Sequence, residues 1–131
     1  MNRPSIILAD DDNALLESVQ KLVELEFRVV ARANDGQQLL DAVREFVPDL
    51  IITDISMGGL SGIRATRQLK AEQPDRRIVF LTVHEEPVFL AEEMKAGALG
   101  YVVKRLAGSE LLPALREVLQ GRPFISSSLR S

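Results

Sequence analysis

The sequence has 131 residues, 46% hydrophobic and 27% charged, with a formal net charge of -3, which suits one globular domain. It has no cysteine and one histidine, His84, so thiolate chemistry, cysteine-ligated zinc and multi-histidine metal sites are excluded. The acidic balance argues against non-specific nucleic-acid binding, and no apolar run approaches the roughly 20 residues of a membrane span. The expected compartment is the cytoplasm.

Short apolar runs alternate along the chain with longer segments whose apolar residues recur at helical spacing. In chain order, the expected elements are a strand over residues 5–9, a helix over 14–25, a strand over 27–33, a helix over 39–47, a strand over 50–53, a helix from 63 that closes before Pro74, a strand over 77–82, a helix over 87–96, a strand over 100–103 and a helix over 110–120. The tail over 122–128 has lost this periodicity and is typical of a linker or a frayed end. We therefore expect a domain over 1–121 and a linker or tail over 122–131.

Proline and glycine residues mark the expected ends of the helices. Pro48 ends one helix, and Gly97 and Gly121 stop two others, since glycine tolerates the left-handed conformation at a helix end. Ser109 is the expected N-cap of the last helix, which places Pro113 in its first turn, where proline is tolerated.

Five strand–helix units in series predict one fold class. Strands that are apolar on both faces and joined by helices favour a parallel sheet between two helical layers, a three-layer α/β domain. Right-handed crossovers narrow the topology, but the spacing of the elements does not give the order of the strands.

Ligands of open parallel sheets bind at the carboxyl ends of the strands, where this chain places polar residues. These residues are Asp10, Asp11 and Asp12 after the first expected strand, Asp54 after the third, Thr82 at the end of the fourth and Lys104 after the fifth. If the first and third strands are neighbours, their carboxylates crowd together and raise one another's pKa. A Mg²⁺ ion relieves that crowding and prefers oxygen ligands. A carboxylate nucleophile, a metal, a hydroxyl and an ammonium together suit phosphoryl transfer.

This arrangement resembles the receiver domain of two-component response regulators, over about residues 5–121. The matching motifs are Ile7-Leu8-Ala9-Asp10-Asp11-Asp12, Pro48-Asp49-Leu50-Ile51-Ile52-Thr53-Asp54-Ile55-Ser56-Met57, Leu81-Thr82-Val83-His84 and Gly100-Tyr101-Val102-Val103-Lys104. Each motif alone is weak, but four in this order at strand ends are specific. In detail the chain is similar to the nitrate-regulator class, whose receivers carry a C-terminal helix-turn-helix.

The resemblance implies a doubly wound, flavodoxin-like (βα)5 fold with strand order 2-1-3-4-5. It implies that Asp54 is the phosphoacceptor and that Mg²⁺ is bound by Asp11, Asp54 and the backbone carbonyl of Ser56. Asp10 would assist through a water molecule. The domain would take its phosphoryl group from a histidine kinase and catalyse its own phosphorylation and dephosphorylation, without being an enzyme otherwise.

The resemblance also implies a switch. Thr82 and Lys104 would bind the phosphoryl oxygens, and Tyr101 would change rotamer when Thr82 moves towards the phosphate. That change would alter the surface of the fourth helix, fifth strand and fifth helix, through which a homodimer is expected. The output would be transcription, through a DNA-binding domain absent from this chain, because no helix-turn-helix follows Gly121.

Two departures and three rival functions accompany this interpretation. Gly58 stands where the family usually has proline, which predicts a more mobile loop. Asp12 stands where the family commonly has Glu or His, and it also fits a simple helix N-cap. Asp10-x-Asp12 resembles the motif of haloacid-dehalogenase-type phosphohydrolases, with Asp10 as nucleophile, although Asn13 continues it poorly. Residues 57–62 hold two of the three glycines of a dinucleotide-binding loop. A receiver that acts only as a binding scaffold is the third alternative.

Overall fold

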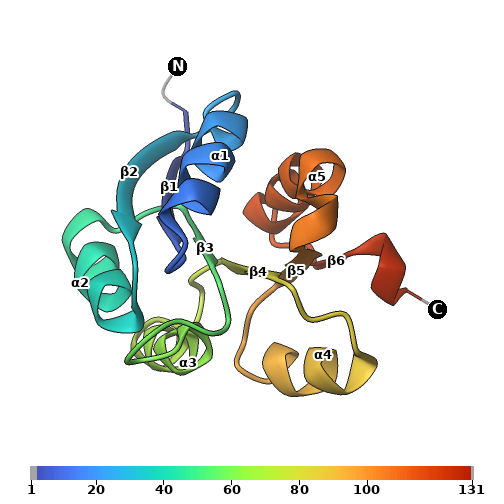
Figure 1. Cartoon of the computed structure of the whole chain (residues 1–131). Helices are drawn as coiled ribbons and strands as arrows, with labels where there is room; N and C mark the ends of the chain where they lie inside the picture. Colours follow the sequence, from blue (N-terminus) through green and yellow to red (C-terminus); the bar gives the residue numbers. More distant parts are fainter. Residues whose placement is uncertain (1–2, 131) are drawn as a thin grey trace.

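The structure is a computed structural model that describes residues 3–130 (Figure 1). Its strands are β1 (Ser5–Ala9), β2 (Arg28–Ala33), β3 (Leu50–Thr53), β4 (Ile78–Thr82), β5 (Gly100–Val103) and β6 (Phe124–Ile125). Its helices are α1 (Asn13–Val23), α2 (Gly36–Phe46), α3 (Gly62–Glu72), α4 (Pro87–Met94) and α5 (Ala107–Leu119), with 3-10 turns at Lys104–Leu106 and Ser127–Leu129.

The strands form one parallel sheet in the order β2-β1-β3-β4-β5-β6. Figure 1 shows α1 and α5 on one side of this sheet and α2, α3 and α4 on the other. The three-layer, flavodoxin-like α/β fold is therefore confirmed, and the order of the first five strands is the one that the family resemblance implied. No helix within residues 3–130 is long and apolar enough to span a lipid bilayer.

Alternating side chains of the strands build two separate cores. Along β1, Ile6 and Leu8 pack with the apolar faces of α1 and α5, whereas Ile7 and Ala9 pack with those of α2 and α3. This alternation follows from the pleat of a strand, which sends successive side chains to opposite faces. A sheet that is buried on both faces exposes only its edges to ligands.

Short polar side chains start the first three helices. Asp12 accepts a hydrogen bond from the backbone of Leu15, and Asp35 accepts one from Gln38 at the start of α2. Ser61 does the same at the start of α3. The N-cap interpretation of Asp12 is confirmed, which separates this acid from Asp10 and Asp11.

The tail differs from the expected frayed end, and the expected five strands become six. The backbone N–H of Phe124 donates to Leu99 and that of Ser126 donates to Tyr101, so residues 124–125 form the edge strand β6 beside β5. Two paired residues are too few to produce the period-2 pattern by which a strand is read from sequence. The domain boundary at residue 121 stays a prediction.

Several helix ends also differ from their expected positions. The last helix starts at Ala107, so Ser109 is not its cap and Pro113 lies in the helix interior rather than its first turn. Leu25 lies beyond the end of α1 and is 66% exposed. Val47 is the C-cap of α2 in a left-handed conformation, with φ 46°, and is 64% exposed. Because Leu25 and Val47 are apolar residues just past the ends of α1 and α2, their spacing made both predicted helices too long.

Candidate functional site

The register of the central strands brings the acids of two distant motifs to one edge. Ala9 at the end of β1 is paired with Thr53 at the end of β3. The pairing continues one residue further, because the N–H of Asp54 donates to Ala9 with a donor–acceptor distance of 2.9 Å. Asp10 and Asp54 therefore leave adjacent strands side by side, at the carboxyl edge of the sheet.

Three carboxylates and one ammonium meet at this edge. Oxygens of Asp10, Asp11 and Asp54 all lie within 4.8 Å of one another. The Nζ atom of Lys104, from the 3-10 turn after β5, lies 2.8 Å from Asp10 Oδ2 and 3.4 Å from Asp54 Oδ2. Asp10 is 3% and Asp54 9% exposed, while Asp11 faces solvent. The site thus has two shielded carboxylates and one open side.

Backbone amides fix the shielded carboxylates. Asp10 Oδ1 accepts a 2.9 Å hydrogen bond from the N–H of Asp12, and Asp54 Oδ1 accepts a 2.8 Å bond from that of Ile55. Each carboxylate therefore has one oxygen oriented by the main chain and the other, Oδ2, directed at Lys104. Such fixed oxygens are suitable ligands and nucleophiles because their geometry is set before a reactant arrives.

The electrostatics show an incomplete balance of charge. Burial raises the pKa of Asp54, and the nearby Asp10 carboxylate raises it further, against the opposing effect of Lys104. Burial disfavours the charged ammonium of Lys104, but the two carboxylates outweigh it and raise the pKa of that lysine. The Lys104 ammonium thus offsets the Asp10 and Asp54 carboxylates only in part, and the ionised form of Asp54 remains disfavoured by its surroundings.

The donor set suits a hard divalent cation. All three clustered ligand atoms are carboxylate oxygens, which Mg²⁺ prefers, and the exposed side at Asp11 leaves room for the water molecules that Mg²⁺ retains. The predicted convergence of Asp10, Asp11 and Asp54 is therefore present. Ser56, the other predicted ligand, lies in the exposed loop after β3, and its role stays a prediction.

Thr82 and Tyr101 are both fully buried beside this edge. Thr82 ends β4, and its hydroxyl accepts a 3.1 Å hydrogen bond from the N–H of His84. The phenol of Tyr101 points inward and donates to Glu93 at 2.6 Å, with the carbonyl oxygen of His84 at 3.2 Å. Both predicted switch residues thus have polar partners in the loop between β4 and α4 or on α4 itself.

Sequence reasoning missed two positioning residues. The Asn34 amide donates to the carbonyl of Asp10 at 3.1 Å and to the Asn13 side chain at 2.6 Å, which ties together the loop that carries the acids. Gly62 lies against the main chain of Asp54 so closely that an added Cβ would overlap its carbonyl oxygen. The run Asn34-Asp35-Gly36 is typical of a turn, and Gly62 lies in a glycine-rich loop, but neither pattern reveals a contact with residues so far away in the sequence.

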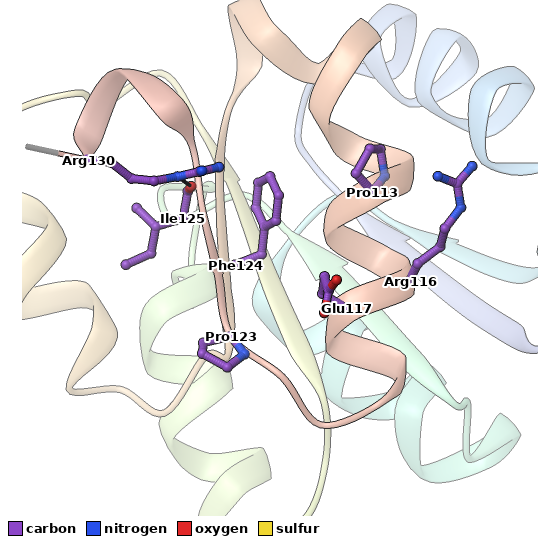
Figure 2. A pocket seen from close by; sticks show the side chains of 7 residues that line it. All are labelled: Pro113, Arg116, Glu117, Pro123, Phe124, Ile125 and Arg130. Carbon is purple, nitrogen blue, oxygen red and sulfur yellow. Dashed lines mark hydrogen bonds between the residues drawn. The ribbon is translucent and has the colours of Figure 1, made fainter.

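A groove lies elsewhere on the surface. It has a volume of about 600 Å³. Figure 2 shows its lining residues on α5 and on the tail. Its lining consists of Pro113, Arg116, Glu117, Pro123, Phe124, Ile125 and Arg130. None of the predicted site residues contributes to it, so it does not compete with the acidic edge as the chemical site.

Comparison with known proteins identifies the family. The model of the response regulator receiver domain matches residues 6–116. The chain belongs to the receiver domain family. This is a signalling family rather than one of metabolic enzymes, and the solved structures similar to this chain include a response regulator of the LuxR family.

Relatives and solved structures agree with this assignment. The response regulator GacA of Pseudomonas aeruginosa is 36% identical over 126 residues, which cover 94% of this chain and 59% of GacA. A LuxR-family two-component response regulator from Aurantimonas sp. SI85-9A1 superposes with a TM-score of 0.93 at 32% identity, covering 98% of this chain and 93% of that one. The RcsB response regulator of Salmonella typhimurium, described in terms of its DNA interaction, has a TM-score of 0.90 at 28% identity and covers 98% of this chain and 66% of its own. The receiver domain spans 53% to 59% of the length of the first two curated relatives it matches.

Proposed function

We propose that Asp54 accepts a phosphoryl group from a histidine kinase and that this modification switches the surface formed by α4, β5 and α5. The observation that carries the proposal is the meeting of Asp10, Asp11 and Asp54 within 4.8 Å, with the ammonium of Lys104 beside two of them. Membership of the receiver family supports the same chemistry.

The chemistry requires the site to attack phosphorus and then hold the product. An oxygen of Asp54 forms a bond to phosphorus as the bond from phosphorus to the kinase's histidine nitrogen breaks, and that nitrogen keeps the electron pair. Lys104 neutralises charge on the transferred group, and the Thr82 hydroxyl, now bonded to the N–H of His84, turns to it. Hydrolysis of the same acyl phosphate at this site returns Asp54, so the domain acts on itself.

Asp11, Asp54 and the carbonyl of Ser56 would hold Mg²⁺, with Asp10 assisting through water. When bound, the ion supplies charge neutralisation for the carboxylates and the phosphoryl oxygens. The single ammonium of Lys104 pairs with two carboxylates, Asp10 and Asp54, while Asp11 adds a third to the same cluster. This excess of negative charge supports a need for more positive charge at this edge. The raised pKa of Asp54, caused first by burial, supports the same conclusion.

We place the output in transcription, through a DNA-binding domain outside this chain. The DNA interaction of RcsB, to which this chain is similar, supports that assignment, and so do solved RcsB dimers bound to DNA. The expected partners are therefore a histidine kinase and a second copy, paired through the α4, β5 and α5 surface. The compartment that suits this pathway is the cytoplasm.

Mass spectrometry tests the proposal directly. The chain is incubated with Mg²⁺ and a small-molecule phosphodonor, and the modified residue is mapped after trapping the acyl phosphate with borohydride. We expect one added phosphoryl group on Asp54, none in Asp54→Asn, and an unchanged fold of that variant. Label on Asp10 would favour the phosphohydrolase alternative, and an unchanged mass would favour a binding scaffold.

A second variant separates metal binding from phosphoryl binding. Lys104→Ala removes the ammonium but none of the proposed metal ligands, so it is expected to reduce the phosphorylation-dependent response more than Mg²⁺ affinity. Titration of Mg²⁺ and measurement of the phosphorylated fraction on the same protein compare the two losses. Equal losses would contradict the role assigned to Lys104.

A further inference from the structure

Glu93 is a buried acid that the proposed phosphoryl chemistry does not use. Glu93 lies on α4 and is only 4% exposed. Its Oε2 atom accepts the 2.6 Å hydrogen bond from the Tyr101 hydroxyl. Burial raises the pKa of Glu93, although the bond from Tyr101 and the nearby His84 act in the opposite direction. Burying a carboxylate costs free energy, so a buried acid in a switch region calls for a physical explanation.

The bond between Glu93 and Tyr101 is of the strong kind. Its length falls in the range of charge-assisted O–H···O bonds, which are shorter and stronger than bonds between neutral groups. The phenol has one proton, so Glu93, with the shorter distance, is its acceptor, and the His84 carbonyl at 3.2 Å is a secondary contact. One hydroxyl thus joins the buried strand β5 to α4.

A run of polar contacts leads from Thr82 to this pair. The Thr82 hydroxyl accepts from the N–H of His84, and the carbonyl of the same residue lies next to the Tyr101 hydroxyl. Tyr101 then donates to Glu93. A movement of Thr82 would therefore disturb the hydrogen bond of the His84 N–H, and the carbonyl of that residue lies beside the Tyr101 hydroxyl.

We propose that Glu93 is a positioning residue that holds Tyr101 inward before any phosphoryl group arrives, so that α4 and Tyr101 move as one unit. This inference rests on the proposed function, in which Thr82 and Tyr101 form the switch. Its consequence is a resting domain that is already biased towards the inward state of Tyr101. Phosphorylation then stabilises an arrangement that Glu93 has partly established.

The size of this bias can be stated as a ratio. A hydrogen bond to a charged group corresponds to roughly a tenfold or larger change in an equilibrium between two states. Without Glu93, the ratio of inward to outward Tyr101 is expected to fall by about that factor in the unphosphorylated domain.

The sequence supplies an intrinsic probe for the test. Tyr101 is the only tyrosine and there is no tryptophan, so ultraviolet fluorescence excited in the tyrosine band reports on this side chain. Quenching of that fluorescence by acrylamide measures how far the ring is accessible from solvent. The experiment uses the 131-residue chain, first without a phosphodonor and then with Mg²⁺ and a phosphodonor.

Three variants make the test specific. Glu93→Leu keeps the side-chain bulk and removes the acceptor, Glu93→Gln keeps a neutral acceptor, and Glu45→Leu changes an exposed acid on α2. Without a phosphodonor, we expect quenching to increase several-fold in Glu93→Leu, less in Glu93→Gln and not at all in Glu45→Leu. With Mg²⁺ and the phosphodonor, quenching is expected to fall back in Glu93→Leu and to change little in the wild type.

The outcomes distinguish this inference from the proposed function. Unchanged quenching in Glu93→Leu would overturn the inference, because packing alone would then hold Tyr101. An equal increase in Glu45→Leu would also overturn it, since the effect would be general loosening. If Glu93→Leu does not fold, Glu93→Gln decides alone, and quenching equal to the wild type contradicts the inference. Failure of phosphorylation, read by mass on the same samples, would count against the proposed function and leave the comparison without phosphodonor intact.

Discussion

Two aspartates flank the same strand and have opposite surroundings. Asp49 precedes β3, and its Oδ2 atom accepts hydrogen bonds from the N–H and hydroxyl of Ser5 at 2.8 and 3.2 Å. Asp54 follows β3 and shares its surroundings with Asp10 and Lys104, so that burial leaves its pKa raised. Neutral hydrogen-bond donors satisfy the Asp49 carboxylate, whereas the negative charge of Asp54 is only partly offset by Lys104.

This difference shows what makes an acid structural or chemical in a parallel sheet. All strands run in one direction, so residues after strands collect at one edge and residues before strands at the other. Asp49 ties the β1 and β3 starts together and needs no ligand. Asp54 lies where several strands deliver charged groups, and its unbalanced charge makes it a candidate for chemistry.

The largest expected effect comes from removing the ammonium of Lys104, which pairs with the acids at this edge. In EDTA, Lys104→Ala leaves Asp10 and Asp54 shielded from water without a counter-charge, and we expect the free energy of unfolding to fall by roughly 2–4 kcal/mol. Urea denaturation, compared with Lys21→Ala on the exposed face of α1, measures this loss. Saturating Mg²⁺ is expected to restore much of it, because the ion supplies positive charge to the same acids.

An equal loss with and without Mg²⁺ would remove the distinction between Asp49 and Asp54. It would mean that Lys104 stabilises the fold through contacts of its alkyl chain rather than through charge. A loss as large in Lys21→Ala would lead to the same conclusion.

The next largest effect tests how the loop after β3 is held. Gly62→Ala places a Cβ against the carbonyl of Asp54, so the start of α3 must move, and we expect a loss of about 2–3 kcal/mol. Gly58 has open space around it, so Gly58→Ala is expected to leave stability unchanged or to raise it by about 0.5 kcal/mol. Thermal unfolding of both variants gives the comparison. Similar losses in the two variants would contradict the close approach at Gly62.

The contrast between these glycines shows how far the sequence can lead. Glycines at 58, 59 and 62 look alike in a flexible loop, and only the structure shows which one touches the main chain of Asp54. The acids at the carboxyl edge were predictable, because strand direction alone collects them there. Glu93 was not, because α4 has exposed apolar residues such as Val88 and Phe89, and its sequence has no clear apolar face to show which acid points inward.

The third effect tests the structural role of Asp49. Asp49→Ala removes the acceptor of the Ser5 N–H and hydroxyl, and we expect a loss of about 1–2 kcal/mol that is the same in EDTA and in Mg²⁺. Phosphorylation of Asp54 by a small-molecule donor is expected to continue at the wild-type rate. A loss that Mg²⁺ reduces would show that Asp49 belongs to the same electrostatic system as Asp54.

The smallest effect has the opposite sign. A raised pKa means that the folded state disfavours the ionised form of Asp54, so in EDTA at neutral pH the wild type is expected to melt at a slightly lower temperature than Asp54→Asn. As the pH falls through the raised pKa, towards about 4, where unfolded carboxyls titrate, Asp54 gains its proton and the difference shrinks. Saturating Mg²⁺ reverses the order, because it binds the carboxylate and not the amide. Calorimetric melting of both proteins at several pH values measures all three trends. If Asp54→Asn instead melts at a lower temperature than the wild type in EDTA at neutral pH, Lys104 already balances the charge of Asp54 without a metal ion.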